Sequence, residues 1–149
     1  MASNSKFAIA IHTAGIIAVF KGKPVASKMI ADSVKTNPVV IRRIIGSFAK
    51  YDLVKVQMGT CGGARLTRPP EKITLADIYM AIGEDGIFEI PTLCESHGCD
   101  FGRTVRPVIQ EILDDAENGL IERLRSVTLA EVLKKVRALM KQDCFEEPG

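Results

Sequence analysis

The stretch from residue 104 to residue 126 constrains the fold most, because its apolar residues recur at the spacing of one helix face. A helix of this length is about 35 Å long at 1.5 Å per residue. In a chain of 149 residues, little else remains to cover such a face. A second copy of the chain is the economical partner, and packing within the monomer is the alternative. The stripe comprises Val105, Val108, Ile109, Ile112, Leu113, Ala116, Leu120, Ile121 and Leu124.

The composition favours a globular protein, since 46% of the residues are hydrophobic and 26% are charged. The most apolar run, residues 7–20, is too short to cross a bilayer, which needs about 20 apolar residues. His12 and Thr13 interrupt this run, and its apolar residues follow helical spacing. We therefore expect an amphipathic first helix rather than a secretory signal peptide, and no membrane partner.

The spacing of the cysteines indicates the cellular compartment of the protein. Cys61, Cys94, Cys99 and Cys144 have irregular spacing, which does not fit a disulfide framework. Reduced thiols in a cytoplasmic protein are the simpler interpretation.

The formal net charge of +2 hides an asymmetry between the two halves of the chain. Residues 1–72 contain 12 Lys and Arg against 3 Asp and Glu, whereas residues 73–149 contain 8 against 15. A basic half of this size suits a polyanion, because each cation that neutralises a phosphate releases condensed counterions. A solvated lysine face is the alternative.

Residues 27–50 have the pattern of a helix-turn-helix. We expect Ser27 to cap a short helix, which ends near Lys35, and Pro38 to open a second helix at its first position. In such a motif the second helix enters the DNA major groove by its N-terminal residues. Its core face would carry Val40, Ile41, Ile44, Ile45 and Phe48. The candidate DNA contacts are Asn37, Val39, Arg42, Arg43 and Ser47, together with Ser27 and Lys28 from the first helix.

The next segment predicts a two-stranded wing. LVKVQ alternates apolar and polar residues, MGTCGGA is a glycine-rich tip, and ARLTRPP returns as a second strand that ends in prolines. The candidate contacts to the DNA backbone or minor groove are Lys55, Gln57, Thr60, Arg65 and the bare amides of Gly62 and Gly63.

The predicted fold is mainly α with a small β-wing, a winged helix-turn-helix joined to a long dimerisation helix. We expect a DNA-binding domain over residues 1–83, a sensor loop over residues 84–103, and the dimerisation and C-terminal helices over residues 104–149. A homodimer of this kind would match two half-sites of palindromic double-stranded DNA.

The order of these elements resembles the Rrf-two family of bacterial transcription regulators over nearly the whole chain. The resemblance rests on FAIAIHTAGIIA, ADSVKTNPVVIRRII, GTCGGARL, ITLADIYMAIG and CDFGRTVRPVIQEIL together with SVTLAEVL. It implies a dimeric winged-helix regulator, usually a repressor, and not an enzyme.

The resemblance also implies which positions read DNA, namely Asn37, Val39 and Arg42 in the recognition helix and residues 58–63 on the wing. This chain departs from the family there, because it has Cys61 where relatives have glycine and Met58 where many have arginine. Arg65 is a possible substitute for that arginine.

The cysteines before the long helix can be interpreted in four ways. Members of the family that hold an iron-sulfur cluster have three cysteines in this loop, whereas this chain has Cys94 and Cys99, with His97 between them. The stretch CDFGRTVRPV instead resembles a cluster-free branch in which one cysteine senses oxidants or electrophiles. We therefore expect Cys99 and Cys94 to be redox-sensing residues and expect no cofactor, metal or catalytic residue. A cluster or metal sensor on the same scaffold, a small thiol-dependent enzyme and buried inert cysteines are the alternatives.

Overall fold

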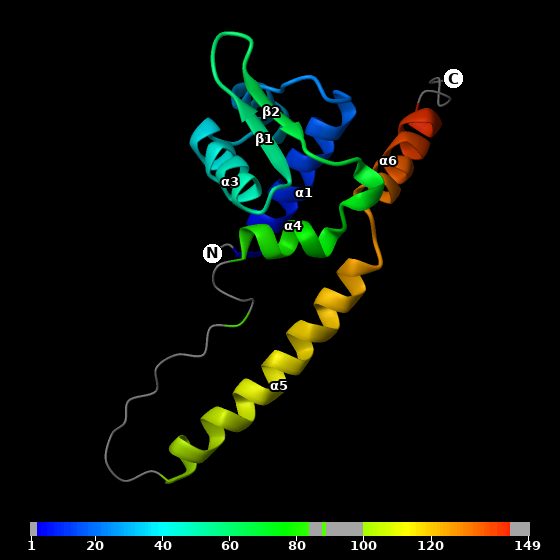
Figure 1. Ribbon diagram of the computed structural model, residues 1–149. Helices are drawn as coiled ribbons and strands as arrows, with labels where there is room; N and C mark the ends of the chain where they lie inside the picture. Colours follow the sequence, from blue (N-terminus) through cyan, green and yellow to red (C-terminus); the bar gives the residue numbers. More distant parts are fainter. Residues whose placement is uncertain (1–2, 84–87, 89–99, 144–149) are drawn as a thin grey trace.

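A long helix projects from a body formed by all the other elements in the computed structural model, which describes residues 3–83, 88 and 100–143 (Figure 1). The body is called the head below. This arrangement confirms the expected fold class, mainly α with a small β-wing. In chain order the elements are α1 (Ser3–Val19), α2 (Ser27–Val34), α3 (Pro38–Lys50), β1 (Val54–Gln57), β2 (Gly63–Leu66), the 3-10 helix η1 (Pro70–Lys72), α4 (Leu75–Ile82), α5 (Asp100–Arg125) and α6 (Leu129–Asp143).

One hydrophobic core holds the head together. The inner face of α3 supplies four buried residues, as its sequence pattern predicts, and Val40 is half-buried beside them. The C-terminal helix α6 adds Leu129 and Leu133 to the same core, so it packs on α1. The four buried residues of α3 are Ile41, Ile44, Ile45 and Phe48.

The two helices of the helix-turn-helix start differently. Asn37 caps α3, since its Oδ1 accepts a hydrogen bond from the Val39 amide at 2.8 Å, and Pro38 follows at the first helical position. The expectation that Ser27 caps α2 is wrong, because the cap position falls on Ala26, whose side chain cannot accept a hydrogen bond. Val25, just before it, pairs with the wing and keeps the chain extended up to Ala26.

The wing is anchored through β2 to the segment between α1 and α2. Strands β1 and β2 pair antiparallel, from Val54 opposite Leu66 to Gln57 opposite Gly63. Val25 and Ala64 exchange two backbone hydrogen bonds of 2.9 Å, which makes Val25 a third, one-residue strand.

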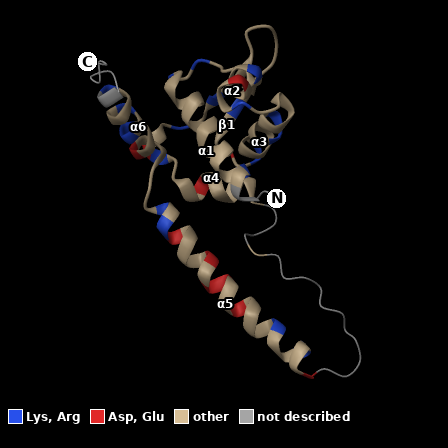
Figure 2. Ribbon diagram, turned by 180° about the vertical axis from the view of Figure 1, so that it is seen from behind, with Lys and Arg blue, Asp and Glu red and all other residues tan. Residues whose placement is uncertain are grey.

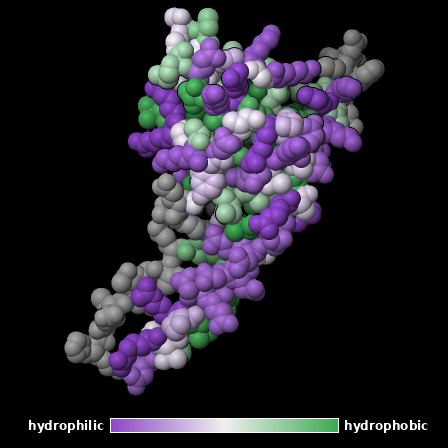
Figure 3. All heavy atoms as spheres, in the orientation of Figure 1, coloured by the Kyte–Doolittle hydropathy of each residue, from purple (hydrophilic) through white to green (hydrophobic). Residues whose placement is uncertain are grey.

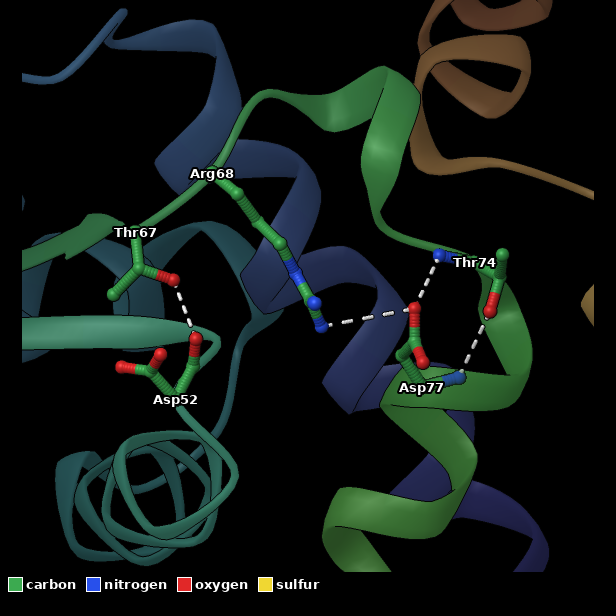
Figure 4. Close-up of polar contacts among 5 residues, drawn as sticks. All are labelled: Asp52, Thr67, Arg68, Thr74 and Asp77. Atoms are coloured by element: carbon green, nitrogen blue, oxygen red, sulfur yellow. Dashed lines mark hydrogen bonds and ion pairs between the residues drawn. The ribbon is translucent and has the colours of Figure 1, made fainter.

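Helix α4 connects the wing to the long helix. Thr74 and Asp77 form a capping box at its start, and the Arg68 side chain reaches across from the end of the wing to the Asp77 carboxylate, 3.8 Å away (Figure 4). Near the other end of α4, the Tyr79 hydroxyl donates a hydrogen bond of 2.8 Å to Glu117 of α5. The Thr67 hydroxyl also bonds the Asp52 carbonyl and fixes the exit of β2.

The apolar stripe of α5 is largely open to solvent. Helix α5 begins at Asp100, four residues before the expected start, and none of its residues is fully buried. Exposure of the stripe reaches 61% at Ile112. The face shown in Figure 3 is mainly hydrophilic, with hydrophobic side chains emerging in patches. Within the described residues, no helix is both long and apolar enough to cross a membrane.

A second apolar surface lies open on the head. A groove of about 640 Å³ is lined by α1, α2 and α6, and its lining includes Ile16, Met29 and Val136. His12 and Ser33 line it as well, with 3.3 Å between His12 Nε2 and Ser33 Oγ.

Candidate DNA-binding surface

The exposed side of α3 carries most of the predicted recognition residues. Asn37, Val39, Arg42 and Arg43 are exposed, and they lie on the helix opposite its buried face. Ser47 is half-buried and its hydroxyl donates to the Arg43 carbonyl at 3.1 Å. Ser47 is therefore the candidate on α3 with the least capacity to meet DNA.

Neither arginine of α3 is engaged in an ion pair with any described residue. Arg42 and Arg43 thus keep their charge and all their donors available for a partner. A guanidinium can bind a phosphate or read the acceptor edge of guanine with two hydrogen bonds.

The wing adds cations next to α3. Lys55 and Arg65 lie directly opposite each other on β1 and β2, and both are exposed. Gln57 and Thr60 are exposed closer to the tip. The wing loop lies at the end of the head farthest from α5, with α3 packed beside the strands (Figure 1).

The two glycines of the wing have structural roles. The Gly62 amide donates to the Gly59 carbonyl at 3.0 Å, so it closes the turn, contrary to the expectation of a bare amide. A Cβ on Gly63 would lie 2.4 Å from the Val25 backbone, and its φ of +153° also favours glycine. These glycines hold the wing together at the places where the sequence predicted phosphate contacts.

The start of α2 contributes one clear candidate. Lys28 is exposed there, whereas Ser27 is half-buried as the first helical residue. The sequence analysis missed Lys23 and Lys35, which are exposed at the two ends of the α2 segment. Pairing of Val25 with Ala64 brings the turn that carries Lys23 to the wing. The excess of Lys and Arg in residues 1–72 includes Lys23 and Lys35, but the pairing of Val25 with Ala64 cannot be seen in the sequence.

Charged residues are distributed unevenly over the molecule. Lys and Arg are concentrated on the head and on α6, and Asp and Glu follow one another along α5 (Figure 2). Between residues 107 and 122 the long helix has five acidic residues and no basic one. The elements that carry the predicted DNA contacts are therefore rich in cations, as a DNA-binding surface requires, whereas α5 is mainly acidic.

The predicted sensor residues lie outside the described part of the chain. This applies to Cys94, Cys99 and His97, and also to Cys144. Among the residues that the structure describes, Cys61 is a free, exposed thiol on the wing, and no three His, Cys, Asp or Glu side chains form a group suited to a metal ion.

A helix-turn-helix, a wing beside it and unpaired cations on both define a winged-helix DNA-binding protein. Comparisons with known proteins agree. The family model Rrf2, described as an iron-dependent transcriptional regulator, matches residues 3–135. The HTH-type transcriptional regulator YwnA of Bacillus subtilis (strain 168) is 31% identical over 134 residues, which is 87% of this chain and 96% of that protein. This chain belongs to the Rrf2 family of transcription regulators.

Solved structures show the same fold. IscR of T. potens superposes with a TM-score of 0.63 at 23% identity, over 97% of this chain and 90% of that one. CymR, the global cysteine regulator of B. subtilis, superposes with a TM-score of 0.58 at 22% identity, over 89% and 93%. The family and the relatives are transcription regulators and not enzymes.

Proposed function

We propose that this chain is a cytoplasmic, homodimeric repressor that binds palindromic DNA through α3 and the wing and responds to oxidants through Cys94 and Cys99. The observation that carries DNA binding is a set of exposed cations that form no ion pair with any described residue, Arg42 and Arg43 on α3 with Lys55 and Arg65 on the wing. Contacts from such cations to phosphates position a protein on DNA, and contacts to base edges provide sequence specificity.

The dimer part of the proposal rests on the apolar stripe of α5. Val108, Ile109 and Ile112 are 50%, 37% and 61% exposed, on a helix that extends beyond the head. A contiguous apolar surface of this kind marks an interface. Two heads held by paired α5 helices would present two recognition helices to two half-sites.

The thiol part of the proposal rests on sequence position and on one relative. Cys99 immediately precedes Asp100, the first residue of α5, and a helix N-terminus favours a thiolate. Arg103 supports it less than expected, because its guanidinium pairs with Asp100 at 2.7 Å. A solved structure of Staphylococcus aureus CymR, 17% identical, is that of an oxidized form.

The first experiment measures fluorescence anisotropy of a labelled duplex from the chain's own promoter at several salt concentrations. We expect Arg42→Ala and Arg43→Ala to weaken binding about tenfold and to reduce the salt slope by about one. Arg137→Ala, an exposed arginine of α6, is the matched control. Unchanged affinity and slope in both α3 variants would exclude α3 as the recognition helix.

The thiol test uses the same duplex in a Cys61→Ser background, because oxidation of the exposed Cys61 would disturb the wing directly. Mild peroxide treatment should change the affinity about tenfold, a coupling of about 1.4 kcal/mol, and Cys99→Ser should abolish that response. An equal response in Cys99→Ser would remove Cys99 as the sensor.

An iron-sulfur sensor is the second candidate, favoured by the family description as an iron-dependent regulator. Protein isolated without oxygen would then show a visible absorption band that is lost in Cys94→Ser and Cys99→Ser. Colourless and iron-free protein would support the thiol mechanism.

A further inference from the structure

Met58 is the most exposed large hydrophobic side chain in the described part of the chain, at 87%. It directly follows β1, at the start of the wing loop. Burial of an apolar side chain is favourable, so a methionine held in water at a binding surface is available to stabilise a complex.

The backbone of the loop that carries Met58 is tightly constrained. Gly59 has a φ of +106°, and the Gly62 amide closes the turn onto the Gly59 carbonyl. A Cβ on Gly62 would lie 2.2 Å from the Gln57 carbonyl oxygen, so the loop is folded closely on itself. One residue pair below the loop, Val25 and Ala64 tie the wing to the rest of the head. The tip therefore presents Met58 in a preorganised position.

The tip of the wing lacks the cation that a DNA-binding surface favours, and Met58 is its one large apolar side chain. Residues 58–62 contain no Lys or Arg, and the nearest wing cations, Lys55 and Arg65, lie further back along the strands. A cation at the tip would read a narrow, electronegative minor groove, whereas an apolar side chain enters by partly unstacking a base step. The cations behind the tip suit the phosphates at the edge of the groove.

We propose that the Met58 side chain inserts into the minor groove as an apolar wedge at a deformable pyrimidine–purine step, while Lys55 and Arg65 contact the flanking phosphates. The wing then selects sites by the ease with which DNA kinks, and α3 selects them by base hydrogen bonds. This inference rests on the proposed DNA binding by α3 and the wing.

The test uses the promoter duplex labelled at both ends, so that anisotropy reports affinity and energy transfer reports the kink. Met58→Gln should weaken binding about tenfold and reduce the kink with no change in salt slope, because no phosphate contact is lost. Met58→Leu, which keeps an apolar wedge, should bind within about twofold of the wild type. Met80→Gln, which alters a 44% exposed methionine of α4, is the matched control and should behave as the wild type.

Wild-type affinity and kink in Met58→Gln would overturn the wedge. A weaker affinity with a lower salt slope would also overturn it, since the defect would then be electrostatic. Both results differ from a failure of the proposed function, in which Arg42→Ala and Arg43→Ala would leave binding unchanged.

Discussion

Tyr79 illustrates how one side chain joins two parts of the molecule. Its hydroxyl donates to Glu117 of α5, and its ring packs edge to face on Phe7 of α1, with 5.5 Å between ring centroids. Burial, followed by the hydrogen bond and the charge of Glu117, raises the pKa of Tyr79 well above its ordinary value of 10.0. The folded state therefore favours the protonated phenol.

We expect Tyr79→Phe to lower the free energy of unfolding by about 1 kcal/mol at pH 7, because a hydrogen bond is lost. The contribution of Tyr79 is complete below the unfolded-state pKa of about 10 and is lost as the pH rises toward the folded-state pKa. The gap between wild type and variant should thus shrink above about pH 10. Urea unfolding followed by circular dichroism at pH 7–11 measures it, with Tyr51→Phe, an exposed tyrosine, as control. A gap that is constant with pH would contradict this account.

Single residues were predictable where the cause is local. The place of Pro38 at the first position of α3 follows from its missing N–H, which would have no partner there. The cap expected at Ser27 failed because pairing of Val25 with Ala64, some 40 positions later, sets the backbone there. The occupied amide of Gly62 was hidden for a similar reason, since the turn type depends on how the two strands meet.

Replacement of two glycines by alanine should change the stability of the head in opposite directions. Gly63→Ala should destabilise the head by about 1–3 kcal/mol, because its Cβ would meet the Val25 backbone at 2.4 Å. Gly46→Ala in α3 should instead stabilise it by about 0.5–1 kcal/mol, because nothing lies within 4 Å and a helix prefers alanine. Thermal unfolding of both variants measures the two effects. A stabilised Gly63→Ala protein would show that β2 and Val25 are not closely packed at this point.

At the scale of elements, the helices and the hairpin followed from hydrophobic spacing, because each pattern repeats over several residues. The third, one-residue strand at Val25 has no pattern to detect. The return of α6 to the core through Leu129 and Leu133 was also invisible, because an amphipathic helix shows that it has a buried face and not which neighbour covers it. The exposed side of α3 was predictable because it is the complement of its core face.

The assembly of the whole molecule can be tested with one added charge. Ile112→Glu places a carboxylate on the open stripe of α5 and should convert a dimer to a monomer at micromolar concentration, with the head still folded. Asn118→Glu adds the same charge away from the stripe and should leave the dimer intact. Sedimentation velocity distinguishes these states, and circular dichroism confirms folding. A dimeric Ile112→Glu protein would mean that the stripe is not the interface.

The continuous helix α5 also limits how the length of this chain can change during evolution. One inserted residue would turn everything beyond it by about 100°, and the apolar stripe would be split between two faces. An insertion of seven residues would keep the two parts in register within about 20°. Insertions and deletions within residues 104–124 should therefore be tolerated at lengths of seven, eleven or eighteen residues, which stay within about 20° of whole turns. Residues 129–143 can vary only where Leu129 and Leu133 keep their places in the core.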